Sequence, residues 1–112
     1  MTFARMFKFH VFADREAAYA AYLRDVVTPI DEAAHKAGAF DRLATVTPQS
    51  AGDWNHGRVF FFRDRAQRDA FAASIAQHAA VFDGSAEATA ARKARAETLR
   101  KLVAIFDFEI TS

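Results

Sequence analysis

Val59–Phe82 reads VFFFRDRAQRDAFAASIAQHAAVF, a short aromatic run that passes through charged residues into an alanine-rich segment. The aromatic run, with Arg58 before it, has the composition of a β-strand. Asp64 stands at a good N-cap position, and the apolar residues after it recur at the helical spacings of three and four: Phe71, Ile75, Ala79 and Phe82. We therefore expect a strand over 58–62, followed at once by a helix that packs on a sheet.

The remaining sequence predicts further strands and helices. Strands are expected where aromatic and β-branched residues are dense: Phe3–Phe12, Leu43–Thr47 and Val103–Thr111. Helices are expected for the segment capped by Asp14, for Thr28 to Gly38, and for Ala86–Lys101. Pro29 predicts a break or kink at Val27 and Thr28, with Thr28 as a new N-cap. Gln49–Gly57 collects turn-forming residues and predicts a loop between two strands.

This order of strands and helices is that of the ferredoxin-like, or split βαβ, plan. It predicts an α+β fold in which helices cover one face of a four-stranded antiparallel sheet. The 112 residues are the length of a single domain, which we expect to span 1–112.

Composition and charge exclude several classes of protein. The chain is 52% hydrophobic with 12 Phe, which is typical of a folded core, and its 15 basic and 14 acidic residues are intermixed. We expect no nucleic acid or membrane as a partner, because the net charge is only +1. With no Cys and no short spacing between its histidines, the sequence predicts no metal site, and without a Gly-rich loop it predicts no cofactor. The N-terminus lacks the pattern of a secretory signal, so a cytoplasmic location is expected.

The sheet face without helices predicts a homodimer. The strands carry Phe on both sides, as at Phe60, Phe61 and Phe62, and a large exposed apolar patch usually marks an interface. We assign four aromatic residues to the helix side: Phe7, Phe9, Phe106 and Phe108. That assignment leaves another set between the two sheets of the dimer: Met6, Lys8, His10, Asp107 and Glu109. Lys8 or His10 is then expected to pair with one of these two carboxylates.

The strand pattern, the run from Val59 through QHAAVF at 77–82, and the closing IFDF at 105–108 resemble the dimeric α/β-barrel superfamily. The resemblance is greatest to its stress-responsive barrel branch, which includes plant polyketide cyclases; cofactor-independent antibiotic-biosynthesis monooxygenases belong to the same superfamily. It implies that His78 is a catalytic base in a pocket between sheet and helices. Ile75 and Ala76 stand where the family motif has a further His and a Pro, and Ala72 stands at the place of a partner Tyr.

Two histidines are candidate catalytic residues. His78 follows Ile75 by three residues, at the border of the apolar stripe, where a half-buried neutral imidazole is a fair general base near pH 7. The alternative is that His78 hydrogen-bonds a backbone carbonyl at the edge of the pocket. His10 is either a second acid or base, or part of a polar network inside the dimer.

The candidate ligand-binding residues are aromatic: Phe62, Phe71, Phe82, Trp54 and Tyr22. Trp54 lies in a loop with His56, where it either covers a pocket or anchors the loop. Tyr22 either orients a ligand through its hydroxyl or belongs to the core. Two hypotheses follow: a cyclase or monooxygenase acting on an apolar aromatic or polyketide-like compound, and a non-catalytic ligand-sensing or structural stress-response dimer.

Overall fold

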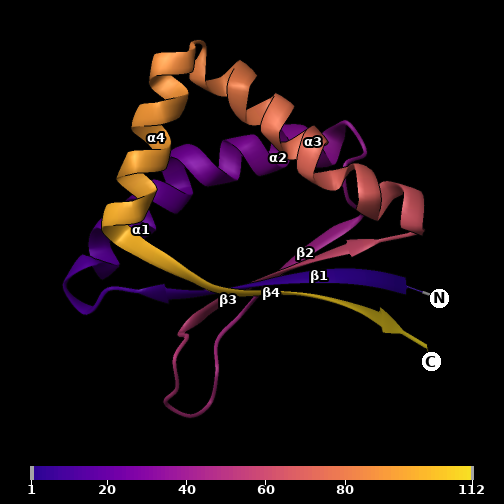
Figure 1. The fold of residues 1–112 in the computed structure, drawn as a ribbon, viewed down its shortest axis with the longest axis horizontal. Coiled ribbons are helices and arrows are strands. Elements are labelled where there is room, and N and C mark those ends of the chain that lie inside the picture. The colour runs from indigo at the N-terminus through magenta and orange to yellow at the C-terminus, as the bar shows by residue number, and fades with distance from the viewer. Residues whose placement is uncertain (1, 112) are drawn as a thin grey trace.

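The computed structural model describes residues 2–111, and its centre is a sheet of four antiparallel strands. The strands are β1 (Thr2–Val11), β2 (Arg42–Val46), β3 (His56–Phe62) and β4 (Arg100–Ile110), in the spatial order β2-β3-β1-β4. All helices lie on one face of the sheet, and the loop between β2 and β3 projects on the other side (Figure 1). The predicted α+β, ferredoxin-like fold is confirmed. We name the two sides of the sheet the helix-covered face and the outer face.

The sequence predicted a break or kink at Val27 and Thr28; the chain stays helical there, but a π turn interrupts its α-helical geometry immediately before Thr28. A 3-10 turn (Ala13–Arg15) leads into α1 (Glu16–Tyr22), a π-helical turn (Leu23–Val27) and α2 (Thr28–Lys36). The Thr28 amide donates to the Leu23 carbonyl, five residues back, and its side chain caps nothing. A wider turn accommodates Pro29, which has no amide hydrogen and would crowd a regular helix. Asp14 makes no capping bond either, because the 3-10 turn separates it from α1.

The other helix ends have regular capping residues, and two of them, Asp64 and Gly38, were predicted from the sequence. The Asp64 side chain accepts from the Gln67 amide at 2.7 Å and begins α3 (Arg65–Asp83). Gly84 ends that helix with a φ of 83°, and Ser85 caps α4 (Ala86–Leu99). Gly38, with a φ of 87°, follows α2. In both glycines the left-handed backbone is one that residues with a Cβ rarely adopt.

The register of β4 overturns the predicted faces of its aromatic residues. Residues opposite one another in an antiparallel pair share a face. Asp107 lies opposite Arg5 on the helix-covered side and bonds it at 2.7 Å, whereas Phe106 lies opposite Met6 on the outer face. Phe108 likewise joins the outer face, and Glu109 the helix-covered side near Arg65. The predicted pairing of Lys8 or His10 with Asp107 or Glu109 is therefore wrong.

A β-bulge is the physical reason for this error. The pairing shifts between Lys8 and Phe9, so that Lys8 faces Ala104 while Phe9 faces Leu102, and Val103 is the extra residue. One extra residue reverses the alternation of side chains along the rest of a strand. Simple alternation from Leu102, opposite the buried Phe9, would have placed Phe106 and Phe108 inward.

The core lies between the sheet and the helices in two clusters. The larger cluster is aromatic and includes Phe3, Phe40, Phe60, Phe62 and Phe71. The smaller one, Val11, Tyr19, Tyr22 and Leu99, fixes α1 and α4 over the start of β4. Asp31, Arg58 and Arg100 lie near these apolar clusters, and the cavities beside them form the candidate site.

Candidate functional site

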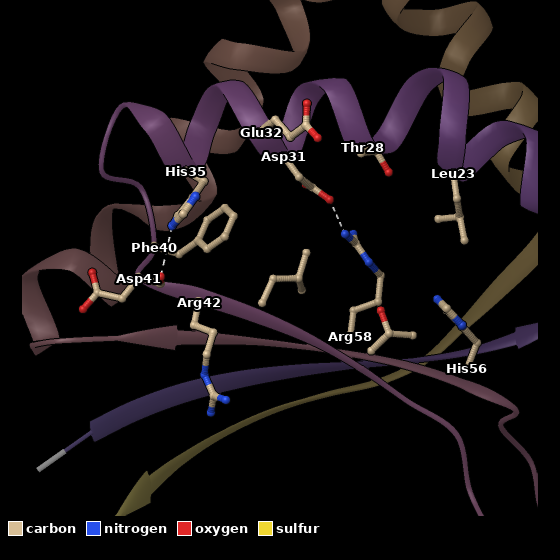
Figure 2. Close-up of a pocket in the computed structure, with 12 residues that line it drawn as sticks. Leu23, Thr28, Asp31, Glu32, His35, Phe40, Asp41, Arg42, His56 and Arg58 are labelled. Carbon is tan, nitrogen blue, oxygen red and sulfur yellow. Dashed lines mark hydrogen bonds and ion pairs between the residues drawn. The ribbon is translucent and has the colours of Figure 1, made fainter.

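An open groove of about 460 Å³ separates α2 from the helix-covered side of β2 and β3 (Figure 2). Its lining combines polar and apolar side chains: Leu23, Thr28, Asp31, Glu32, His35, Phe40, Asp41, Arg42, Leu43, Thr45, His56 and Arg58. His35, at its far end, contacts the Asp41 carbonyl oxygen at 3.0 Å. The volume falls within the range of small-molecule sites, about 300–1,000 Å³.

Asp31 and Arg58 form a largely buried ion pair across this groove, reaching from α2 to β3 (Figure 2). Asp31 is placed inward because it follows Ile30 on the buried side of α2. Arg58 shares the helix-covered face of β3 with Phe60 and Phe62, because every second residue of a strand points to the same side. Burial raises the pKa of the Asp31 carboxyl, and the Arg58 guanidinium partly opposes that effect. A buried pair of this kind depends on both partners, since either charge alone would be strongly destabilising.

A second, inner cavity of about 190 Å³ lies on the other side of the ion pair. Asp31 and Arg58 line both spaces, so the pair is part of the wall between them. The remaining lining is mainly apolar, with two further arginines: Phe7, Phe9, Tyr22, Val27, Ile30, Phe60, Phe71, Ile75, Ala79, Arg92 and Arg100. An apolar cavity with a few convergent polar groups is the usual form of a small-molecule site.

His56 begins β3 at the end of the outer groove, with its ring edge-on to Tyr19 at 5.2 Å between centroids. Its Nε2 atom is buried and makes no hydrogen bond within the described structure. Burial, and then the charges of Arg58 and Arg100, lower the pKa of His56 to about 4. The ring is therefore neutral at physiological pH.

Arg100, the first residue of β4, extends the polar region into the inner cavity. It donates to the Tyr19 hydroxyl at 2.9 Å, and its guanidinium lies 4.0 Å from the centre of the Phe9 ring. Arg92 lines the same cavity but is paired with Asp83 at 3.0 Å. The three arginines, with Asp31 and His56, form the polar part of the candidate site.

The structure places the two candidate catalytic histidines, His78 and His10, away from the groove and the inner cavity. His78 lies on α3, half-buried, and does not line the groove or the inner cavity. His10 lies between the inward-facing Phe9 and Val11 on β1, so it points to the outer face, where its ring contacts Phe12. Their predicted catalytic roles stay predictions, but neither lies with the polar groups described above.

The predicted ligand-binding residues are also divided. Phe71 and Tyr22 line the inner cavity, while Phe62 lies beside Phe71 in the core and lines neither space. Phe82 is 45% exposed near the end of α3 and borders a separate space of about 240 Å³ beside Tyr22. Trp54 belongs to the outer face, where the Lys8 ammonium lies 4.9 Å from its ring centre.

Sequence reasoning missed Asp31 and Arg100 and gave His56 and Arg58 no specific role. One signal was present for Asp31, a carboxylate between Ile30 and Ala34 on the inward side of a helix. A charge in such a position usually has a buried partner. Arg58 shows a similar signal, because strand alternation places it on the same face as Phe60.

Other kinds of site find no support among residues 2–111. No group of three or more His, Asp or Glu side chains in this range is arranged to hold a metal ion. Within the same range, no helix is both long and apolar enough to span a membrane.

Solved structures share this arrangement of helices and sheet. HapK from Hahella chejuensis matches with a TM-score of 0.59 at 15% identity, over 97% of this chain and 92% of its own. A protein of unknown function from Nitrosomonas europaea gives a TM-score of 0.59 at 22% identity, over 99% and 90%. A protein from Jannaschia sp. CCS1, described as dimeric and ferredoxin-like, gives 0.58 at 13%, over 98% and 100%.

No family model matches the sequence, and no curated protein matches it. The likeness to solved structures is one of fold, and at this level the predicted ferredoxin-like fold is confirmed. A shared fold of this kind carries many functions, so the function must be argued from the site.

Proposed function

We propose that this protein binds a small, largely apolar molecule in the spaces between its sheet and helices. The observation that carries the proposal is the meeting of two cavities at the Asp31–Arg58 pair, with Phe7, Phe60 and Phe71 as apolar walls of the inner one. Apolar walls would hold the body of the ligand, and the ion pair would orient its polar groups.

The protein would act as a homodimer through the outer face. Phe106 is 50% exposed on that face, Phe108 is 40% exposed, and Phe61 lies nearby on β3. Exposed aromatic residues on one sheet face are typical of an interface, and the Jannaschia neighbour is described as dimeric. The loop between β2 and β3, which projects on this side, would reach toward the second copy (Figure 1).

The chemistry best supported is proton abstraction by a neutral histidine, as in a cofactor-independent cyclase or monooxygenase. We favour His56 over His78 because only His56 lines the groove beside Arg58. With a pKa of about 4 it is a weak base, suited to acidic C–H groups such as those between two carbonyls of a polyketide-like compound. His56 would take that proton, the resulting carbanion would attack a second carbonyl of the same molecule, and the alkoxide formed would take the proton back.

Ligand binding is tested by thermal unfolding of the purified protein with a panel of one-ring and two-ring aromatic compounds. We expect at least one compound to raise the Tm. Ala79→Leu, which fills the inner cavity, should abolish that rise, whereas Ala80→Leu, at the exposed neighbouring position on α3, should leave it intact. No rise with any compound, or equal rises in both variants, would contradict binding in this cavity.

Catalysis is tested by hydrogen–deuterium exchange at C2 of benzoylacetone, a 1,3-dicarbonyl compound, followed by NMR in D₂O. We expect the protein to accelerate exchange, and His56→Leu to remove the acceleration while His78→Leu retains it. If only His78→Leu removed the acceleration, His78 would be the base, as the family resemblance implies. A ligand that binds without any accelerated exchange would favour the non-catalytic ligand-sensing dimer.

Light scattering tests the dimer, and a monomer at micromolar concentration would contradict it.

A further inference from the structure

Arg100 differs from the other two arginines of the inner cavity in its lack of a carboxylate. Arg58 is paired with Asp31 and Arg92 with Asp83, whereas no carboxylate within residues 2–111 lies at ion-pair distance from Arg100. The side chain is only partly exposed, with its guanidinium against the rings of Phe9 and Tyr19. The carboxylate that Arg100 does influence, Asp31, is already paired with Arg58, so a half-buried cation here would gain from a further negative charge.

The surroundings of Arg100 fix its guanidinium in an orientation that suits an anionic ligand group. One guanidinium nitrogen donates to the Tyr19 hydroxyl at 2.9 Å, and the aromatic rings fix the plane of the group. A guanidinium has five N–H donors, so most of them remain available for a planar, two-oxygen acceptor. Tyr19 does not line the inner cavity, whereas Arg100 does, so Tyr19 acts as a positioning residue behind the guanidinium.

The charge balance of the cavity favours an anion. Asp31 and Asp83 neutralise two of the three arginines, and His56 nearby is neutral because burial and the arginine charges oppose its protonation. One positive charge is therefore left over among the described groups of the cavity. The rest of the wall, including Phe7, Phe60 and Ile75, is apolar.

We infer that the inner cavity is an oxyanion site: it takes a compact aromatic or aliphatic compound that carries one carboxylate or enolate group, with the oxygens on Arg100. This inference rests on the proposed binding function and narrows its ligand class. The cavity of about 190 Å³ fits a molecule of one or two rings. A carboxylate ligand would bring its charge with it, whereas an enolate would acquire that charge when its proton is removed.

The test is isothermal titration of the full chain with 2-naphthoate and with 2-naphthamide, its neutral analogue of nearly equal shape. Wild type should bind naphthoate about tenfold or more tightly than naphthamide, the range of a charge-assisted hydrogen bond. Arg100→Gln should remove this preference without weakening naphthamide binding, and Arg100→Lys should retain part of it. Tyr19→Phe should reduce the preference to an intermediate value, because it frees the guanidinium from its anchor.

Lys93→Gln is the matched control, because it removes one positive charge from α4 at an exposed position that does not line the inner cavity. It should leave the preference for naphthoate unchanged. Equal loss in Lys93→Gln and Arg100→Gln would reveal a general effect of charge and overturn the inference. Naphthamide bound as tightly as naphthoate by wild type would overturn the oxyanion site but leave the binding function standing. If neither compound bound, the result would contradict both the oxyanion site and the proposed binding function.

The source of the oxyanion is tested by adding benzoylacetone at a pH below and a pH above its own ionisation. Preference for the ionised form that depends on Arg100 would assign the site to enolates as well as carboxylates. Binding of naphthoate alone would restrict the site to carboxylates.

Discussion

The helix-covered face and the outer face of the same sheet both carry phenylalanine, but they differ in how it is buried. On the helix-covered face, the ring centroids of Phe60 and Phe62 lie 4.6 Å and 5.3 Å from that of Phe71, and all three are nearly free of solvent. On the outer face, Phe106 and Phe108 stay substantially exposed, with the Lys8 ammonium 4.8 Å from the Phe106 ring centre. One face is completed by its own helices, and the other needs a further surface.

The same contrast applies to the charged groups. The helix-covered face encloses Asp31, Arg58, His56 and Arg100 beside its cavities, where burial and the two arginine charges shift the pKa values of Asp31 and His56. The outer face has Lys8 between aromatic rings, where a cation stays partly hydrated and contributes little beyond its contacts. We therefore expect ligand chemistry on the first face and assembly on the second, and the following predictions test that division.

The largest effect is expected from a cavity in the helix-covered core. Phe71→Ala removes a ring that is 3% exposed and contacts four other phenylalanines, so the free energy of unfolding should fall by about 3–5 kcal/mol. Urea unfolding measures it. Phe82→Ala, on the same helix but 45% exposed, should cost about 1 kcal/mol or less. Equal losses in the two variants would mean that the aromatic cluster does not dominate the core.

The second effect concerns the buried ion pair. Asp31→Leu leaves Arg58 without its partner at the wall of both cavities and should lower the free energy of unfolding by about 3 kcal/mol. The double variant Asp31→Leu with Arg58→Met removes both charges and should recover most of that loss. Asp25→Asn, which breaks the exposed pair with Arg24, serves as the control and should leave stability nearly unchanged. A double variant no more stable than the single one would contradict the argument from desolvation.

The third effect tests whether assembly belongs to the outer face alone. Ile105 and Phe106 are adjacent and each is 50% exposed, but they point to opposite faces. Phe106→Asp should weaken dimerisation about a hundredfold, because it buries a charge in the interface, whereas Ile105→Asp should leave it unchanged. Analytical ultracentrifugation measures both. A stronger effect of Ile105→Asp would move the interface to the other side of β4.

These tests also mark what the sequence could predict. Strand and helix positions followed from periodicity, and the cap at Asp64 followed from local chemistry. The face of Phe106 did not, because the bulge at Val103 depends on pairing with β1 and no Gly or Pro marks it. Pro29 indicated an irregularity before Thr28, but not its form, because a π turn that accommodates a proline has no simple sequence signature.

The candidate site was less accessible to sequence reasoning than the fold. Asp31 and Arg58 are 27 positions apart, and only the packing of α2 over β3 brings them together. Tyr19 and Arg100 are 81 positions apart and come from opposite ends of the chain. Phe71 and Tyr22 do line the inner cavity, because large aromatic residues at helical spacing indicate an inward face, but their role in binding stays a prediction.

The last prediction concerns His56, whose pKa is lowered by burial and by the arginines of the helix-covered face. Its pKa of about 4 in the folded protein lies below the ordinary value of 6.5, so the unfolded chain takes up this proton first as the pH falls. The free energy of unfolding should therefore decrease from about pH 6.5 down to about pH 4, by about 2 kcal/mol after allowance for partial solvent screening. Above about pH 6.5, His56 contributes no pH dependence.

Urea unfolding of wild type and His56→Leu across pH 4–7 isolates this contribution. Asp83 and Asp107, whose pKa values are lowered, also make the protein less stable in acid. Their contribution is the same in both proteins, so it cancels when the two free energies of unfolding are subtracted. Because the buried Nε2 atom has no hydrogen-bond partner, leucine at this position removes the titration without breaking a hydrogen bond of that atom. The variant should therefore be relatively more stable as the pH falls toward 4, whereas parallel curves would mean that His56 is as hydrated as a residue of the outer face.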